Sequence, residues 1–178
     1  MHGNRLFLLL INLVGGIAII GSYLAGFSAN PQLAELFWGG VPAGLRPIYT
    51  ANMILAAIGY FAFTGFILFA LDPERTWVAD RFRFNIFNVI YAGILLPSAL
   101  WMPLTNLAMV EPNPILVWII RFVLLLVALA SVVLLLALLK TNQRAPIWAH
   151  RLALIGTLFF CFQTVILDAA IWGILFNP

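Results

Sequence analysis

The sequence predicts an all-α, polytopic integral membrane protein with five transmembrane helices in one bundle. Of its 178 residues, 64% are hydrophobic and only 8% are charged, whereas a soluble domain carries roughly 25% charged residues. The mean hydropathy is +1.08. The apolar residues also fall into five stretches, each with the roughly 20 residues needed to cross a hydrocarbon core about 30 Å thick.

We expect one domain over residues 1–178. Its helices are predicted at about 5–26, 48–71, 85–107, 115–139 and 147–176. The first stretch begins with a positive charge, Arg5, as a secretory signal does. Its apolar core runs past the roughly 7–15 residues typical of such signals, so we expect a helix that is retained.

The connecting segments differ in length and charge. Residues 72–84 form a short, charged link, and Pro112 and Pro114 stiffen the link after the third helix. Residues 27–47 form a long outer loop, in which the amphipathic piece from Gln32 to Trp38 predicts a short interfacial helix. Loops of this length are often lids, binding loops or docking surfaces.

The basic residues of the short segments predict the orientation. They are Arg5, Arg75, Arg81, Arg83, Lys140 and Arg144. Because lysine and arginine are enriched in cytoplasmic loops, we expect the N-terminus on the cytoplasmic side and the C-terminus on the opposite side. Five crossings require the same opposition. The net charge of +3 thus indicates topology and not nucleic-acid binding.

Two charged residues lie inside the apolar stretches, Arg121 in the fourth helix and Asp168 in the fifth. At a rise of ~1.5 Å per residue they lie about 9 Å and about 12 Å from the outer ends of their helices. Such charges are costly unless they face the bundle interior and find a partner. We therefore expect a direct interhelical pair, which is either structural or part of a ligand or transport site.

Further polar and aromatic side chains share this depth, so we predict a ligand-binding site in the outer half. Pro97 should open a kink in the third helix, with Trp101 one turn later on the wall of a pocket; an ordinary packing kink is the alternative. The candidate ligand-binding residues are Trp38, Tyr49, Asn52, Pro97, Ser98, Trp101, Arg121, Thr164 and Asp168. Gln163 is placed in the inner half, and Trp118, Trp148 and Trp172 are interpreted as interfacial anchors.

Several kinds of chemistry are disfavoured. The single cysteine, Cys161, excludes an intrachain disulfide and a Cys-X-X-Cys redox site. Two histidines leave little room for a metal cluster, and the sequence identifies no cofactor. There is no phosphate-binding glycine loop, and Thr164 with Asp168 lacks the histidine or second acid of a catalytic site. The sequence therefore predicts no catalytic residues, although a quinone- or lipid-handling activity stays open.

The first loop carries an aromatic run that ends in proline, the second helix carries tyrosine and glycine, and the third carries asparagine and tryptophan. These residues are Phe37, Trp38 and Pro42, then Tyr49, Met53 and Gly59, then Asn85, Asn88 and Trp101. Together with the five-helix plan and the long first loop, they resemble the translocator protein (TspO/MBR) family. The resemblance implies a non-enzymatic binder of sterols, porphyrins or other flat apolar ligands that is often dimeric.

The sequence thus favours a non-enzymatic membrane protein that binds a small hydrophobic ligand, such as a sterol, porphyrin, quinone or lipid-like molecule, in an outer-half polar and aromatic cavity. Two alternatives remain: an accessory subunit of a larger respiratory or photosynthetic membrane complex, and a small transporter. The expected partners are membrane lipid, the ligand, and either a second copy of the chain or other membrane subunits.

The topology can be tested with reporters. A reporter fused after Pro178 should lie on the side of the membrane opposite to a reporter inserted in the 72–84 loop, because an odd number of crossings separates the two positions. Protease protection of both fusions in sealed vesicles provides the measurement. If both reporters are found on the same side, the five-span prediction is wrong.

Overall fold

The computed structural model describes residues 3–29, 35 and 37–177. Its elements are α1 (Gly3–Ala29), η1 (Ala43–Leu45), α3 (Arg46–Gly65), η2 (Phe66–Ala70), β1 (Trp77–Val78), β2 (Phe82–Arg83), α4 (Ile86–Val110), α5 (Pro114–Leu139), α6 (Ile147–Cys161), η3 (Phe162–Trp172) and α7 (Gly173–Leu175). The predicted interfacial helix from Gln32 to Trp38 falls largely outside the described residues.

These elements join into five helices that are long and apolar enough to cross a membrane. The all-α prediction and the positions of the five stretches are confirmed to within a few residues at the helix ends. The helices begin where the sequence provides a suitable first turn. Pro47 and Pro114 lie in the first turns of α3 and α5, where the missing N–H of proline costs no helical hydrogen bond. The side chain of Asn113 also accepts a bond of 2.8 Å from the N–H of Ile115, which caps α5.

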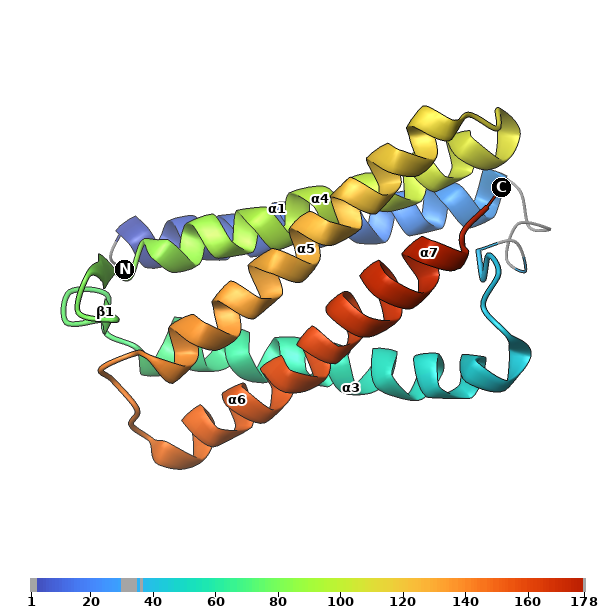
Figure 1. Cartoon of the computed structure of the whole chain (residues 1–178). Helices are drawn as coiled ribbons and strands as arrows, with labels where there is room; N and C mark the ends of the chain where they lie inside the picture. Colours follow the sequence, from blue (N-terminus) through green and yellow to red (C-terminus); the bar gives the residue numbers. More distant parts are fainter. Residues whose placement is uncertain (1–2, 30–34, 36, 178) are drawn as a thin grey trace.

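The helices run side by side (Figure 1). α4 packs between α1 and α5, α5 packs on α6 and η3, and α3 packs on α6. The N-terminus and β1 lie at one end of the bundle, and the C-terminus lies at the other (Figure 1). We call these the inner and the outer end.

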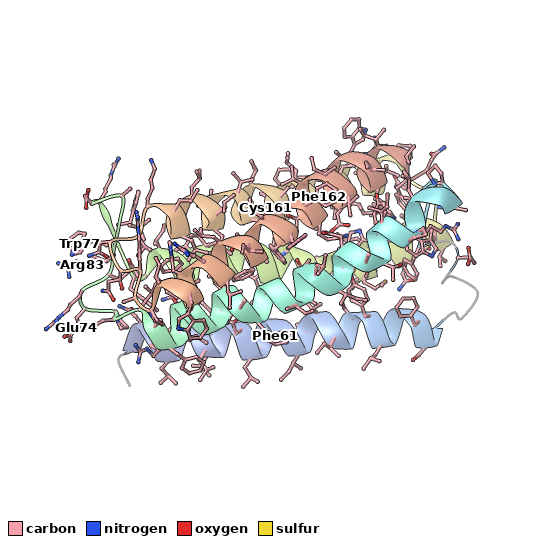
Figure 2. All side chains as sticks on the ribbon, turned by 90° about the horizontal axis from the view of Figure 1, so that it is seen from below. Phe61, Glu74, Trp77, Arg83, Cys161 and Phe162 are labelled. Carbon is pink, nitrogen blue, oxygen red and sulfur yellow. The ribbon has the colours of Figure 1, made fainter. Side chains whose placement is uncertain are left out.

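α1 and α3 are joined near the inner end and separate beyond it. Arg5 donates to the carbonyl of Leu71 over 2.7 Å, and the Tyr60 hydroxyl donates to Oδ1 of Asn12 over 2.5 Å. From there the two helices diverge toward the outer end (Figures 1 and 2). The outer halves of α1 and α3 therefore face each other across the part of the bundle that contains η3.

The charged 72–84 link is more ordered than a plain turn. β1 and β2 pair antiparallel, and Ala79 and Asp80 adopt the positive φ angles of 52° and 53° between them, as a tight hairpin turn requires. Oδ1 of Asn142 accepts a hydrogen bond of 2.9 Å from the N–H of Trp77. This bond fastens the hairpin to the segment after α5, so the inner end carries a small folded cap whose Trp77 and Arg83 project from the bundle (Figure 2).

α3 and α6 approach so closely that only glycine fits at their contact. A Cβ atom added to Gly59 would lie 2.7 Å from Cα of Gly156, and one added to Gly156 would lie 2.6 Å from Cα of Gly59. Small residues of this kind let helix backbones come together in membranes. This contact sets the distance between α3 and the fifth helix. In the fifth helix, α6 continues directly into η3.

Gly59→Ala and Gly156→Ala should each lower the stability of the protein in detergent by about 1–3 kcal/mol, because the backbones must move apart to admit a methyl group. Gly65→Ala is the matched control. A Cβ atom added to Gly65 would have no neighbour within 4 Å apart from its chain neighbours and the backbone of its own helix. Thermal unfolding followed by circular dichroism measures both effects. Equal melting temperatures for Gly59→Ala and Gly65→Ala would contradict the close packing.

Candidate functional site

The fifth helix changes its hydrogen-bonding pattern where the predicted site begins. From Phe162 to Trp172 it is a π-helix, η3, in which bonds join residues five apart; such segments are rare and are often found at functional sites. Gln163 and Asp168 are five residues apart, so η3 brings them to one face. Nε2 of Gln163 donates to Oδ1 of Asp168 over 2.8 Å. The placement of Gln163 in the inner half, away from Asp168, was therefore wrong.

Two of the predicted site residues tie α3 to this face. Nδ2 of Asn52 donates to Oε1 of Gln163 over 3.0 Å and to the carbonyl of Phe159 over 3.1 Å. The Tyr49 hydroxyl donates to the carbonyl of Leu167 over 2.6 Å. Tyr49, Asn52 and Gln163 are all buried. Asn52, Gln163 and Asp168 thus form one continuous chain of hydrogen bonds.

The predicted pair of Arg121 with Asp168 is not formed. Nε of Arg121 donates to the carbonyl of Gly173 over 2.7 Å, and Nη2 lies 3.5 Å from the carbonyl of Ile174. The guanidinium also lies over the ring of Trp118, 5.0 Å from its centroid. The last carbonyls of a helix have no partner within it, and a cation at a helix C-terminus is favourable. Arg121 therefore caps the end of the fifth helix, farther out than Asp168.

Asp168 is left without a cationic partner among the described residues. Oδ1 accepts from Gln163, and no described residue donates to Oδ2. The side chain lies deep in the bundle, where desolvation acts on it, yet it keeps some accessible surface. Asp168 follows Leu167, whose carbonyl accepts a hydrogen bond from Tyr49 of α3, and it precedes Trp172 by four residues on the same helix. The carboxylate therefore lies in the part of η3 that packs on α3.

Aromatic rings from three helices and the first loop gather at the same end of the bundle. We call this group the outer aromatic cluster; it consists of Tyr23, Phe27, Phe37, Trp101, Trp172 and Phe176. The rings of Trp101 and Trp172 are 5.2 Å apart, and those of Tyr23 and Trp101 are 5.8 Å apart. Trp172 stacks on Phe176 at 4.4 Å. Trp172, four residues after Asp168 on η3, is thus the cluster residue that lies on the same helix as the carboxylate.

The two indole N–H groups of the cluster are in different situations. Nε1 of Trp172 donates to the carbonyl of Phe37 over 2.7 Å, and its side chain is 5% exposed. The interpretation of Trp172 as an interfacial anchor was therefore wrong. Nε1 of Trp101 is buried and has no hydrogen-bond partner among the described residues. A buried donor without an acceptor costs about 1–3 kcal/mol. The site thus holds one donor, Nε1 of Trp101, and one acceptor, Oδ2 of Asp168, that have no described partner.

Three of the remaining predicted residues face elsewhere. The Ser98 hydroxyl donates within α4 to the carbonyl of Ile94 over 2.6 Å, next to the buried Pro97. The Thr164 hydroxyl lies 2.7 Å from that of Ser131 and so links η3 to α5. Trp38, in contrast, packs edge-on against Tyr49 with ring centroids 6.0 Å apart. Of the predicted residues, the structure thus brings together Trp38, Tyr49, Asn52 and Asp168, with Trp101 one aromatic ring away.

The chemistry of this site is that of one carboxylate, two amides, phenols and indoles. No three His, Cys, Asp or Glu side chains converge within the described part of the chain, so these residues offer no set of metal ligands. The carboxylate also lacks an acid–base partner among its described neighbours. The arrangement can bind and orient a molecule with complementary polar groups.

Two shallow grooves elsewhere on the protein do not include these residues. One, of about 420 Å³, lies between the end of α3 with η2 and the start of α6. The other, of about 280 Å³, lies between α1 and α4. Both lie on the flanks of the bundle and are lined almost entirely by apolar side chains.

Comparison with protein-family models, curated proteins and solved structures finds no match to this chain. The functional argument therefore depends on the contacts of the site itself.

Two double-mutant cycles test the partners of Asp168. Gln163→Leu and Asp168→Leu should be coupled by about 0.5–3 kcal/mol, because the two side chains share a hydrogen bond. The side chains of Arg121 and Asp168 have separate partners. The effects of Arg121→Leu and Asp168→Leu on the free energy of unfolding should therefore add to within about 0.5 kcal/mol. Stability in detergent provides both measurements. Strong coupling between positions 121 and 168, with none between 163 and 168, would restore the ion pair and contradict the observed contacts.

Proposed function

We propose that this multi-pass membrane protein binds a small, mainly apolar ligand in the outer half of its bundle, at Asp168 and the outer aromatic cluster. The observation that carries the proposal is the Asp168 carboxylate, which lies on the same helix as Trp172 of the cluster and has one neutral amide as its described donor. A polar group in a membrane helix needs a partner within the protein or in a bound molecule. A ligand that meets Asp168 would supply that partner.

The surroundings support an apolar ligand body. The rings of Tyr23, Phe37 and Trp101 approach one another at 5.8 Å and 6.3 Å, and Tyr23 and Trp101 are only partly buried. Ligand sites in proteins are lined mainly by such rings, with few polar groups to fix orientation. The sterols and other flat apolar molecules implied by the resemblance to the translocator protein family have this shape.

The orientation proposed from the sequence is consistent with this site. The exposed basic residues of the hairpin and of the segment after α5 lie at the inner end, among them Arg81, Arg83 and Lys140. Under the positive-inside rule this end faces the cytoplasm. The ligand site then lies in the half of the membrane opposite to the cytoplasm.

A subunit role is the second candidate, favoured by α1. A Cβ atom added to Gly16 or Gly21 would have no neighbour within 4 Å, and both residues lie on a helix that packs mainly on α4. Small residues on a lipid-facing helix allow a partner helix to approach closely. Either a second copy of the chain or another membrane subunit would fit there.

A photoreactive sterol tests the proposed ligand site. In detergent, it should label peptides of the outer aromatic cluster, and an excess of the unreactive sterol should compete. Trp101→Leu should reduce this labelling about tenfold, because it removes a ring that contacts both Tyr23 and Trp172. Trp118→Leu is the control: Trp118 is 67% exposed and outside the cluster. Labelling spread over exposed side chains and resistant to competition would contradict the proposal.

A further inference from the structure

We propose that the outer site selects ligands that carry an organic cation, such as an alkylammonium group, on an apolar body. This inference rests on the proposed ligand site and adds the chemical class of the ligand. Two observations support it: aromatic side chains gather near the Asp168 carboxylate, and no described Lys, Arg or His side chain pairs with this carboxylate.

The carboxylate is not sufficiently stabilised by the described residues alone. The cost of removing a carboxylate from water exceeds what a single hydrogen bond returns. Asp168 receives one described bond of this kind, from Gln163. The carbonyl of Gln163 accepts from Asn52, so the amide group is oriented with its nitrogen toward the carboxylate, and this donor is neutral. A positive charge beside Oδ2 would supply the missing stabilisation.

The cations nearest to the outer end are already engaged. Arg121 is bonded to the end of the fifth helix. Nη1 of Arg46 pairs with Oε2 of Glu35 over 2.7 Å, and its guanidinium lies 5.3 Å from the ring centroid of Trp38. No Lys, Arg or His of the described segments forms an ion pair with Asp168. A cation that meets Asp168 would therefore have to come from a bound molecule.

The neighbouring rings distinguish an organic cation from a metal ion. Trp172 follows Asp168 by four residues on η3, and its ring lies 5.2 Å from that of Trp101, which in turn contacts Tyr23 and Phe37. Aromatic faces attract alkylammonium groups and are the usual walls of sites that bind them. A hard metal ion needs several oxygen ligands, and the described surroundings of Asp168 offer a single carboxylate. The apolar body would extend along the rings toward α1 and α3.

The unused Trp101 N–H defines a second requirement. Nε1 of Trp101 is a buried donor without a described acceptor. A ligand with an ether, hydroxyl or carbonyl oxygen near its cation would accept from this group. The preferred ligand is thus an amphipathic amine with one acceptor oxygen, and its charge and its acceptor can be varied separately.

Two photoreactive sterols that differ only in charge test the inference. One carries a trimethylammonium group and the other carries the neutral tert-butyl group of the same shape. The cationic probe should label the outer aromatic cluster at a concentration at least tenfold lower than the neutral probe. In Asp168→Asn this preference should disappear, while labelling by the neutral probe stays. Glu111→Gln, which removes an exposed carboxylate at the same end, should leave the preference unchanged.

The outcomes separate the two proposals. Equal labelling by both probes, with competition by unreactive sterol, would overturn the cation preference and leave the proposed ligand site in place. A preference that survives in Asp168→Asn would overturn the role of this carboxylate. Failure of both probes to label the cluster would overturn the ligand site and the inference together. If Asp168→Asn does not fold, the comparison of the two probes on the unmodified protein still decides whether charge is recognised.

Discussion

The hydrogen bond from Gln163 to Asp168 is the interaction around which the outer half of this protein is arranged. A carboxylate inside a bundle of apolar helices is tolerated only where it is held by neighbours. The π-helical η3 provides such a neighbour because it aligns residues five apart. Asn52 then fixes Gln163 from α3, and Tyr49 fixes the backbone of η3 one residue before Asp168. The carboxylate is oriented by three residues before any ligand binds.

The rest of the fold supports this arrangement from a distance. The contact between Gly59 and Gly156 holds α3 against α6, and α6 continues directly into η3. Arg121 secures the other end of the same helix at Gly173. η3 is therefore held at both ends, while α1, which carries Tyr23, is joined to α3 only nearer the inner end.

The sequence predicted where the helices lie along the chain, but not which face of each helix points into the bundle. Five apolar stretches of sufficient length predicted the five helices, because length and hydrophobicity depend on local composition alone. Depth along the membrane correctly grouped Tyr49, Asn52 and Asp168. It could not show which way a side chain points about its helix axis, so Arg121 was wrongly paired with Asp168.

A regular α-helix was also assumed for the fifth stretch. In such a helix residues three or four apart share a face, so the five-residue spacing of Gln163 and Asp168 gave no signal. Trp172 was misinterpreted for a related reason: its position near a helix end suggested the membrane interface, whereas the first loop covers it and accepts its N–H. Contacts of this kind depend on tertiary packing and leave no trace in local sequence.

The direction in which Asp168 faces can be measured directly by cross-linking. In a Cys161→Ser background, cysteines replace Asp168 and Tyr23 in one variant and Asp168 and Arg121 in another, and a short bifunctional thiol reagent is added to the protein in native membranes. We expect efficient cross-linking between positions 23 and 168 and little between positions 121 and 168. The reverse result, with only the 121–168 pair cross-linked, would contradict the account of the site.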